Sequence, residues 1–251
     1  MTPESPISRL ARSDGHSLAY RHTPGRTPGI LFLPGFRSDM TGTKATALET
    51  HCRGAGRAFA RFDYFGHGAS SGTFTDGTIG RWIEDATAVL DTVLRGPVVL
   101  VGSSMGGWLM LHVALQRPER VVGLVGVAPA PDFTEDLIWQ AGPESMRTTL
   151  RETGVYFEPS AYDPEPTPIT LRLIEEGRRH LLMRGRIAIS CPMRLLHGMA
   201  DRDVPYVLSL RLAAAVQAND VRVSLIKDGD HRLSRPEDLA LLGRAVDDLA
   251  G

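Results

Sequence analysis

The sequence has only two cysteines among its 251 residues, Cys52 and Cys191. Both lie in apolar surroundings, and no Cys/His spacing is typical of a zinc site, so we expect two free thiols and no metal. A formal net charge of −1 leaves no basic excess for binding nucleic acid or an anionic membrane surface. No apolar run approaches the roughly 20 residues of a membrane span.

Targeting and cofactor signals are missing as well. The N-terminal stretch MTPESPISRLARSDG has neither a hydrophobic signal core nor a long amphipathic segment rich in Arg and Ser. We therefore expect a cytoplasmic protein, and a monomer or weak homo-oligomer. There is no phosphate-binding loop of the Walker type and no dinucleotide fingerprint, so we expect no cofactor.

Short apolar runs alternate with helical patterns along most of the chain. An opening β-hairpin is followed by predicted strands at 29–35, 57–64, 97–102 and 121–130, and by CPMRLLHG and VRVSLIKDG before a last helix from about 236. Helical patterns separate most of these strands. The alternation predicts a doubly wound, mostly parallel α/β sheet, and we expect residues 1–251 to form one domain.

One segment, residues 131–190, breaks this alternation. It contains the proline-rich EPSAYDPEPTP and the helical pattern ITLRLIEEGRRHLLMR, but no convincing core strand. Ligands in open α/β sheets bind beyond the carboxyl ends of the strands. We therefore interpret the segment as a helical lid over that edge; a decorative insertion is the alternative.

The stretch LVGSSMGG, residues 100–107, places two serines between an apolar run and two glycines. A sharp strand-to-helix turn around a nucleophilic serine needs glycine two residues before and two residues after it, because side chains there block the approach of strand and helix. Gly102 and Gly106 satisfy this for Ser104, whereas bulky residues flank Ser103. The pattern predicts Ser104 as a nucleophile.

A serine hydroxyl needs a base to take its proton, and in this architecture an acid and then a histidine follow the serine in the chain. His231 lies on a loop between the last strand and the last helix, where such a base is expected. Asp201 follows a buried strand directly and is the favoured acid, with Asp203 as the alternative or as a helix N-cap. His197, at the end of the same strand, is expected to be structural.

Acyl transfer also needs two amide groups that stabilise a developing oxyanion. The backbone N–H of Met105, the first residue after the nucleophile, is one candidate. The other is the N–H of Phe36, which follows Pro34 and Gly35 beyond the 29–35 strand.

These motifs together resemble the α/β-hydrolase superfamily, and within it the family of mitochondrial palmitoyl-protein thioesterases that also hydrolyse acyl glucuronides. The similarity rests on LPGFRSDMTGTKA, RFDYFGHGASSG, GPVVLVGSSMGGWLMLH, CPMRLLHGMADRDVP and DHR, which span nearly the whole chain. It implies Ser104, Asp201 and His231 as the triad, and cofactor-free hydrolysis of a small-molecule or S-acylated substrate. Animal members begin with a transit peptide, which the N-terminal stretch of this sequence does not resemble. We therefore expect a cytoplasmic, bacterial-type member.

Two other classes of function remain open at this point. The same residues serve C–C bond hydrolysis and cofactor-free haloperoxidase chemistry, and the fold also occurs in non-catalytic binding proteins.

Lid residues are expected to decide the substrate. Leu137, Ile138 and Trp139 are candidates for an apolar acyl pocket together with Phe36. The adjacent Arg178 and Arg179 belong either to a solvated face or to a site for an anionic leaving group.

Overall fold

The structure, a computed structural model, describes residues 5–159 and 165–251. Its centre is an eight-stranded sheet with the strand order β1-β2-β4-β3-β5-β6-β9-β10. The strands are β1 (Ser8–Ala11), β2 (Ser17–Thr23), β3 (Arg26–Leu33), β4 (Arg57–Phe62), β5 (Val98–Ser103), β6 (Val121–Val127), β9 (Met193–Gly198) and β10 (Val221–Ile226). The β1–β2 and β2–β4 pairs are antiparallel and every other pair is parallel, which confirms the predicted fold.

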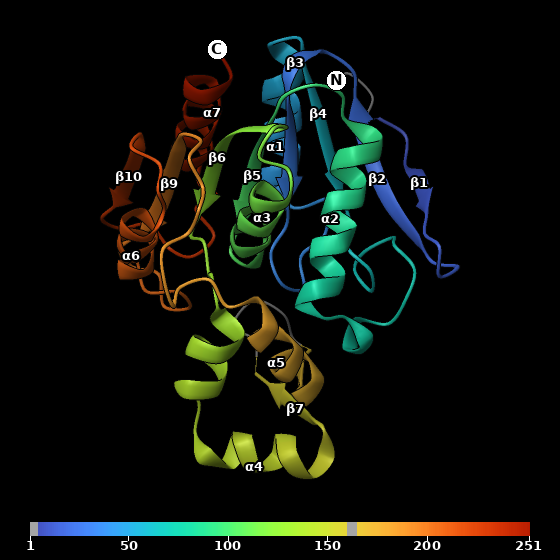
Figure 1. Cartoon of the computed structure of the whole chain (residues 1–251), viewed down its shortest axis with the longest axis vertical. Helices are drawn as coiled ribbons and strands as arrows, with labels where there is room; N and C mark the ends of the chain where they lie inside the picture. The colour runs from blue at the N-terminus through green and yellow to red at the C-terminus, as the bar shows by residue number, and fades with distance from the viewer. Residues whose placement is uncertain (1–4, 160–164) are drawn as a thin grey trace.

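Helices cover both faces of this sheet (Figure 1). On one face lie α1 (Thr43–Gly54) and α7 (Pro236–Ala250), and on the other α2 (Ile79–Val93), α3 (Met105–Gln116) and α6 (Val207–Ala215). The central strands are mostly apolar because both of their faces are buried. In β5, Val98 and Leu100 join the core under α2 and α3, while Val99 and Val101 join the core under α1 and α7. No helix in the two described ranges is long and apolar enough to cross a membrane.

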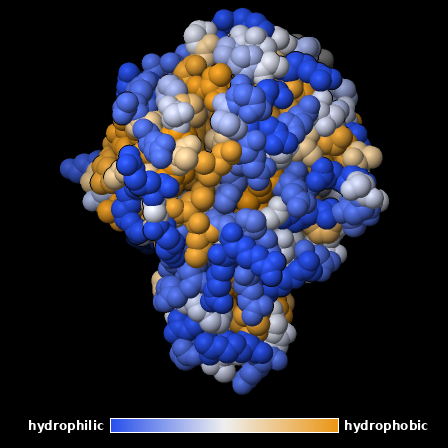
Figure 2. Space-filling view, in the orientation of Figure 1, coloured by the Kyte–Doolittle hydropathy of each residue, from blue (hydrophilic) through white to orange (hydrophobic). Residues whose placement is uncertain are grey.

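The chain between β6 and β9 forms a small lobe beyond the carboxyl ends of the parallel strands (Figure 1). It contains a π-helical turn, η2 (Thr134–Gln140), then α4 (Glu144–Thr153), the antiparallel pair β7 (Val155–Glu158) and β8 (Thr167–Thr170), α5 (Leu171–Gly177) and the turn η3 (Arg178–His180). A further short turn, η1 (Phe74–Asp76), lies before α2. No strand of the lobe joins the main sheet, as predicted. The face of the lobe seen in Figure 2 is mainly hydrophilic.

The lobe has its own apolar core of Met146, Leu150, Ile169 and Ile174. Its helical part after β8 is shorter than the pattern in 169–184 predicted, because α5 ends at Gly177. The buried carboxylate of Asp132 accepts hydrogen bonds from the amides of Leu182 and Met183 at 2.8 and 2.9 Å, which fastens the returning chain to the start of the lobe. Residues 160–164 of the predicted proline-rich stretch lie outside the described residues.

His67 is a buried core residue rather than the polar loop residue that its glycine-rich surroundings suggest. Its ring lies against Trp82 and Phe74, with centroids 5.2 and 5.0 Å away, and Nδ1 lies 3.1 Å from the Phe65 carbonyl oxygen. Burial lowers the pKa of His67 to about 4 from an ordinary value of 6.5. The folded protein therefore holds this imidazole in its neutral form.

We predict that the titration of His67 makes the protein less stable in acid. Between pH 6.5 and 4 the unfolded chain binds a proton at this residue that the folded chain does not, so the free energy of unfolding decreases as the pH falls. The loss is at most about 3 kcal/mol at pH 4. The measurement is urea unfolding of wild type and His67→Gln at several pH values. The stability difference between the two should shrink as the pH falls, and a constant difference would contradict the prediction. Asp85, whose pKa burial raises to about 6, acts in the opposite sense but equally in both proteins.

Candidate active site

Ser104 occupies the turn between β5 and α3 in a backbone conformation that is unusual for a residue with a side chain. Its φ is 53° and its ψ is −118°. Such a conformation costs about 1–3 kcal/mol and persists only where surrounding contacts enforce it. Here the Ser104 amide donates to the Val127 carbonyl oxygen of β6 at 3.0 Å, and its carbonyl accepts from the Gly107 amide at 2.9 Å. The turn projects the serine hydroxyl beyond the edge of the sheet.

The glycines of the motif are required by close packing of backbone against backbone. A Cβ atom at Gly102 would collide with the carbonyl of Gly106, and one at Gly106 would collide with the carbonyl of Leu33 at the end of β3. A Cβ at Gly35 would lie 3.3 Å from the Cβ of Ser104. The strand, the helix and the loop after β3 therefore meet at the serine only because these positions lack side chains.

The structure brings Ser104, His231 and Asp201 together from three separate parts of the chain. The Ser104 Oγ atom lies 3.1 Å from His231 Nε2, and His231 Nδ1 lies 2.7 Å from Asp201 Oδ2. A carboxylate can only accept, so Nδ1 carries a hydrogen and Nε2 is left to accept from the serine hydroxyl. The histidine is thus oriented to take a proton from Ser104.

The side chain of Asp201 is fully buried, and N–H groups surround its carboxylate. The amides of Asp203 and Val204 each donate to Oδ1 at 2.9 Å. On the other side, His197 Nε2 lies 3.2 Å from Oδ2, which His231 also contacts. Burial alone would raise the pKa of Asp201, but the hydrogen bonds from His197 and His231 outweigh it and hold the pKa well below its usual range. Asp201 therefore remains ionised throughout the neutral pH range.

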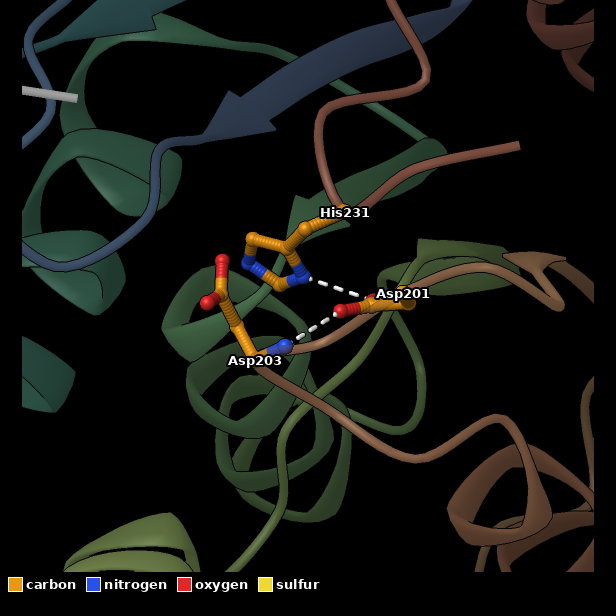
Figure 3. A group of neighbouring side chains, drawn as sticks. All are labelled: Asp201, Asp203 and His231. Atoms are coloured by element: carbon orange, nitrogen blue, oxygen red, sulfur yellow. Dashed lines mark hydrogen bonds and ion pairs between the residues drawn. The ribbon is translucent and has the colours of Figure 1, made fainter. Parts of the chain in front are cut away.

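Asp203 is not a helix N-cap, so that prediction is wrong. The next helix, α6, is preceded by Tyr206, which makes no side-chain cap. The intervening residues form a turn around the Asp201 carboxylate, and this delays the helix. Figure 3 shows the Asp203 carboxylate beside the edge of the His231 ring that faces away from Asp201.

Asp201, Asp203 and His231 also form a group that brings one potential metal-ligand atom each within 4.8 Å of the others. The donor set does not fit a resident cation. Both oxygens of Asp201 already face two N–H groups each, and both nitrogens of His231 are engaged. A carboxylate offers about four lone-pair positions, and hydrogen bonding uses them here.

The two predicted oxyanion donors belong to the same pocket as the serine. Phe36 and Met105 both line the pocket above Ser104, and neither amide donates a hydrogen bond to another group in the described part of the chain. The loop that carries Phe36 is braced from below, because the Met40 amide donates to Asp63 Oδ1 at 2.6 Å. The Phe36 ring packs against Phe133 with centroids 5.6 Å apart, which links this loop to the lobe.

A pocket with a volume of about 580 Å³ opens above Ser104 between the sheet and the lobe. This volume lies within the range of small-molecule sites in proteins. One wall is apolar and includes the predicted Leu137 and Ile138. Further apolar lining comes from Phe36, Met105, Ala130, Phe133 and Ile169. Trp139 does not line the pocket, contrary to prediction. It lies on the other side of η2, where the guanidinium groups of Arg151 and Arg178 cover its ring at 5.3 and 4.8 Å.

Charged residues also line the pocket, and the sequence analysis did not identify them; they are called the charged wall below. Its residues come from five separate loops and element ends: Arg37, Lys44, Glu158, Arg202, Asp203 and Arg232. Burial lowers the pKa of Lys44 to about 8, and its ammonium group donates to the Arg232 carbonyl oxygen at 2.5 Å. Neither Arg178 nor Arg179 lines the pocket. Arg178 donates to Glu135 at 2.7 Å instead. Only the position of Arg202 next to Asp201 in the sequence could have signalled this wall.

The fold and the Ser–His–Asp geometry are typical of α/β-hydrolases, and comparison with known proteins identifies the family. A model of the alpha/beta hydrolase family matches residues 30–240. The chain belongs to this family, which confirms the resemblance seen in the sequence.

Individual proteins are similar to this chain over nearly its whole length. The mitochondrial palmitoyl-protein thioesterase ABHD10 of Mus musculus is 44% identical over 97% of this chain and 82% of its own length. The Homo sapiens protein of the same name is 43% identical over 97% of this chain and 79% of its own length.

Solved structures agree with these matches. The mouse alpha/beta hydrolase domain-containing protein 10 superposes with a TM-score of 0.91 at 43% identity, over 98% of both chains. A putative hydrolase from Agrobacterium vitis S4 has a TM-score of 0.93 at 44% identity, over 98% of this chain and all of the other.

The predicted cytoplasmic location is wrong in the light of these relatives, which are named as mitochondrial proteins. The expectation rested on the composition of the N-terminal stretch alone. A targeting segment is recognised by a receptor and is separate from the folded domain. The folded domain is what the comparison matches.

Proposed function

We propose that the protein is a serine hydrolase that cleaves carboxylic thioesters or esters through an acyl-enzyme on Ser104. The observation that carries this proposal is the chain of contacts from Ser104 Oγ to His231 Nε2, at 3.1 Å, and from His231 Nδ1 to Asp201 Oδ2, at 2.7 Å. Relatives at 43–44% identity are named palmitoyl-protein thioesterases, which supports a thioester with a long acyl chain as the substrate class.

The geometry supplies each step of acyl transfer. As Ser104 Oγ attacks the carbonyl carbon, His231 Nε2 takes the hydroxyl proton, and the Asp201 carboxylate stabilises the imidazolium that forms. The amides of Phe36 and Met105 stabilise the negative charge on the carbonyl oxygen. The intermediate then expels the thiol or alcohol, which receives the proton from His231. A water molecule repeats the sequence and releases the acid.

The two walls of the pocket divide the substrate between them. The apolar wall from the lobe takes the acyl chain, which gains about 0.8 kcal/mol for each buried CH₂ group. The charged wall, with Lys44 and Arg202, faces the leaving group. In this arrangement residues 131–190 act as the lid of a single α/β-hydrolase domain, and motion of the lobe would control entry of the chain.

Ser104→Ala should abolish nearly all hydrolysis. At most the activity that binding and the oxyanion donors supply, roughly 10³–10⁴-fold above water, should remain. Ser103→Ala is the matched control, because Ser103 is buried at the end of β5 and outside the Ser–His–Asp contacts. Labelling with a fluorophosphonate and hydrolysis of an acyl thioester measure both variants. Label on Ser104→Ala and none on Ser103→Ala would move the nucleophile to Ser103. A wild type that takes no label would favour a non-catalytic binding protein.

Asp201→Asn should lower kcat by up to about 10⁴-fold, because an amide group in place of the carboxylate favours the wrong tautomer of His231. Asp203→Asn should retain most of the activity, because the contact of Asp203 with Asp201 is made by its backbone amide. Steady-state kinetics on one thioester substrate separates the two variants. The reverse ranking would assign the acid role to Asp203.

The apolar wall predicts that kcat/KM rises with acyl length until the pocket is full, by up to about fourfold per CH₂ group. Leu137→Ser should flatten this dependence and leave short-chain substrates nearly unaffected. Leu210→Ser, at an exposed position on α6 outside the pocket, is the control. A series of thioesters from acetyl to palmitoyl is the measurement. Equal slopes for wild type and Leu137→Ser would contradict the assignment of this wall.

A further inference from the structure

A second histidine lies against the triad acid and takes no part in the acyl-transfer steps. His197 is the penultimate residue of β9, and its side chain is fully buried. Its Nε2 atom lies 3.0 Å from the Val204 carbonyl oxygen and 3.2 Å from Asp201 Oδ2. Both neighbours can only accept, so this nitrogen carries a hydrogen that the two oxygens share.

The other nitrogen of the ring holds His197 in this orientation. Nδ1 lies 2.7 Å from the hydroxyl oxygen of Ser209, which is itself fully buried on α6. Nε2 carries its hydrogen toward the two oxygens, and Nδ1 forms a hydrogen bond with the Ser209 hydroxyl. The ring therefore bridges α6 to the turn around Asp201, and neither of its polar atoms faces solvent.

We propose that His197 is a positioning residue that acts on catalysis through Asp201, an inference that rests on the proposed function. By holding the Val204 carbonyl it fixes the turn whose amides bind Asp201 Oδ1. By lying beside Oδ2 it keeps this oxygen on the line to His231 Nδ1, 2.7 Å away. Two histidines then share one carboxylate oxygen.

If His197 and His231 share the charge of the Asp201 carboxylate, His197 should affect the pH dependence of the rate, which a purely structural role would not do. The Asp201 carboxylate stabilises the protonated form of His231, and a second N–H beside Oδ2 weakens that effect. Removing His197 should therefore favour protonated His231 and move the acid limb of the pH–rate profile to higher pH, since only neutral His231 accepts the serine proton. The other charged residues that line the pocket with His231 are common to wild type and all variants: Arg37, Lys44, Glu158, Arg202, Asp203 and Arg232.

The experiment compares His197→Leu, which removes both nitrogens, with His197→Gln, which can place an amide N–H near the position of Nε2. Active sites are counted by fluorophosphonate labelling, and kcat and KM for an uncharged acyl ester are measured from pH 5 to 9. We expect His197→Leu to lower kcat per labelled site by roughly 10–100-fold with little change in KM. Its acid limb should move upward by roughly half a pH unit or more. His197→Gln should restore most of both properties.

Ser209→Ala provides a second route if His197→Leu does not fold. It removes only the partner of Nδ1, and its acid limb should move in the same direction by a smaller amount. An acid limb that coincides with that of wild type, in whichever of the two variants folds, overturns the proposal, even if the labelled fraction falls. Failure of the proposed function looks different, because wild type itself would then neither take the label nor hydrolyse the ester.

Discussion

The close approach of three backbone segments at Ser104 is the constraint on which the rest of the site depends. Strand β5, helix α3 and the loop after β3 approach so closely that Gly102, Gly106 and Gly35 have no room, or almost none, for a Cβ atom. The same approach forces a positive φ on Ser104, and among the residues that the structure describes it leaves the amides of Met105 and Phe36 without acceptors. Backbone strain of this kind is tolerated because the buried sheet on both sides over-determines it.

Burial of a charged acid is the second constraint, and the protein meets it with N–H groups rather than with a cation. Isolated burial of a carboxylate is expensive. The turn amides on Oδ1 and the two histidines at Oδ2 compensate Asp201 and also fix its direction. An arginine in this position would neutralise the acid more strongly, but it would compete directly with the imidazolium of His231. The single N–H of His197 that faces Asp201 orients the carboxylate, and the contact of His231 with the same oxygen is kept.

Most of the central sheet and the sequence positions of the candidate triad are predictable because they depend on local rules. Apolar runs identify buried strands, and the glycine spacing selects Ser104 over Ser103. The turn at Asp203 was not predicted because it depends on a hydrogen bond from the Asp203 amide to the Asp201 carboxylate. The residue types at positions 202–206 do not indicate that contact. Trp139 was misplaced for a related reason. The π-helical turn η2 rotates the face of the segment relative to an α-helix, so an apolar run alone does not show which side chain enters the pocket.

The residues proposed to carry out the reaction lie at the edge of the sheet, whereas many of those proposed to select the acyl chain lie in the lobe. Every atom assigned to bond making belongs to the ends of sheet strands or to the loops that follow them, whereas much of the apolar wall comes from the lobe. The first and last parts of the lobe are tied to each other, because the Asp132 carboxylate accepts hydrogen bonds from the amides of Leu182 and Met183. Substitutions in its interior can thus change the acyl wall without disturbing Ser104. Conversely, Phe36 belongs to both parts, since its amide is the proposed oxyanion donor and its ring packs on Phe133 of the lobe. In the proposed mechanism, movement of the lobe would therefore reach the oxyanion donor through the Phe36 ring, and acyl-chain binding would be coupled to transition-state stabilisation at this residue.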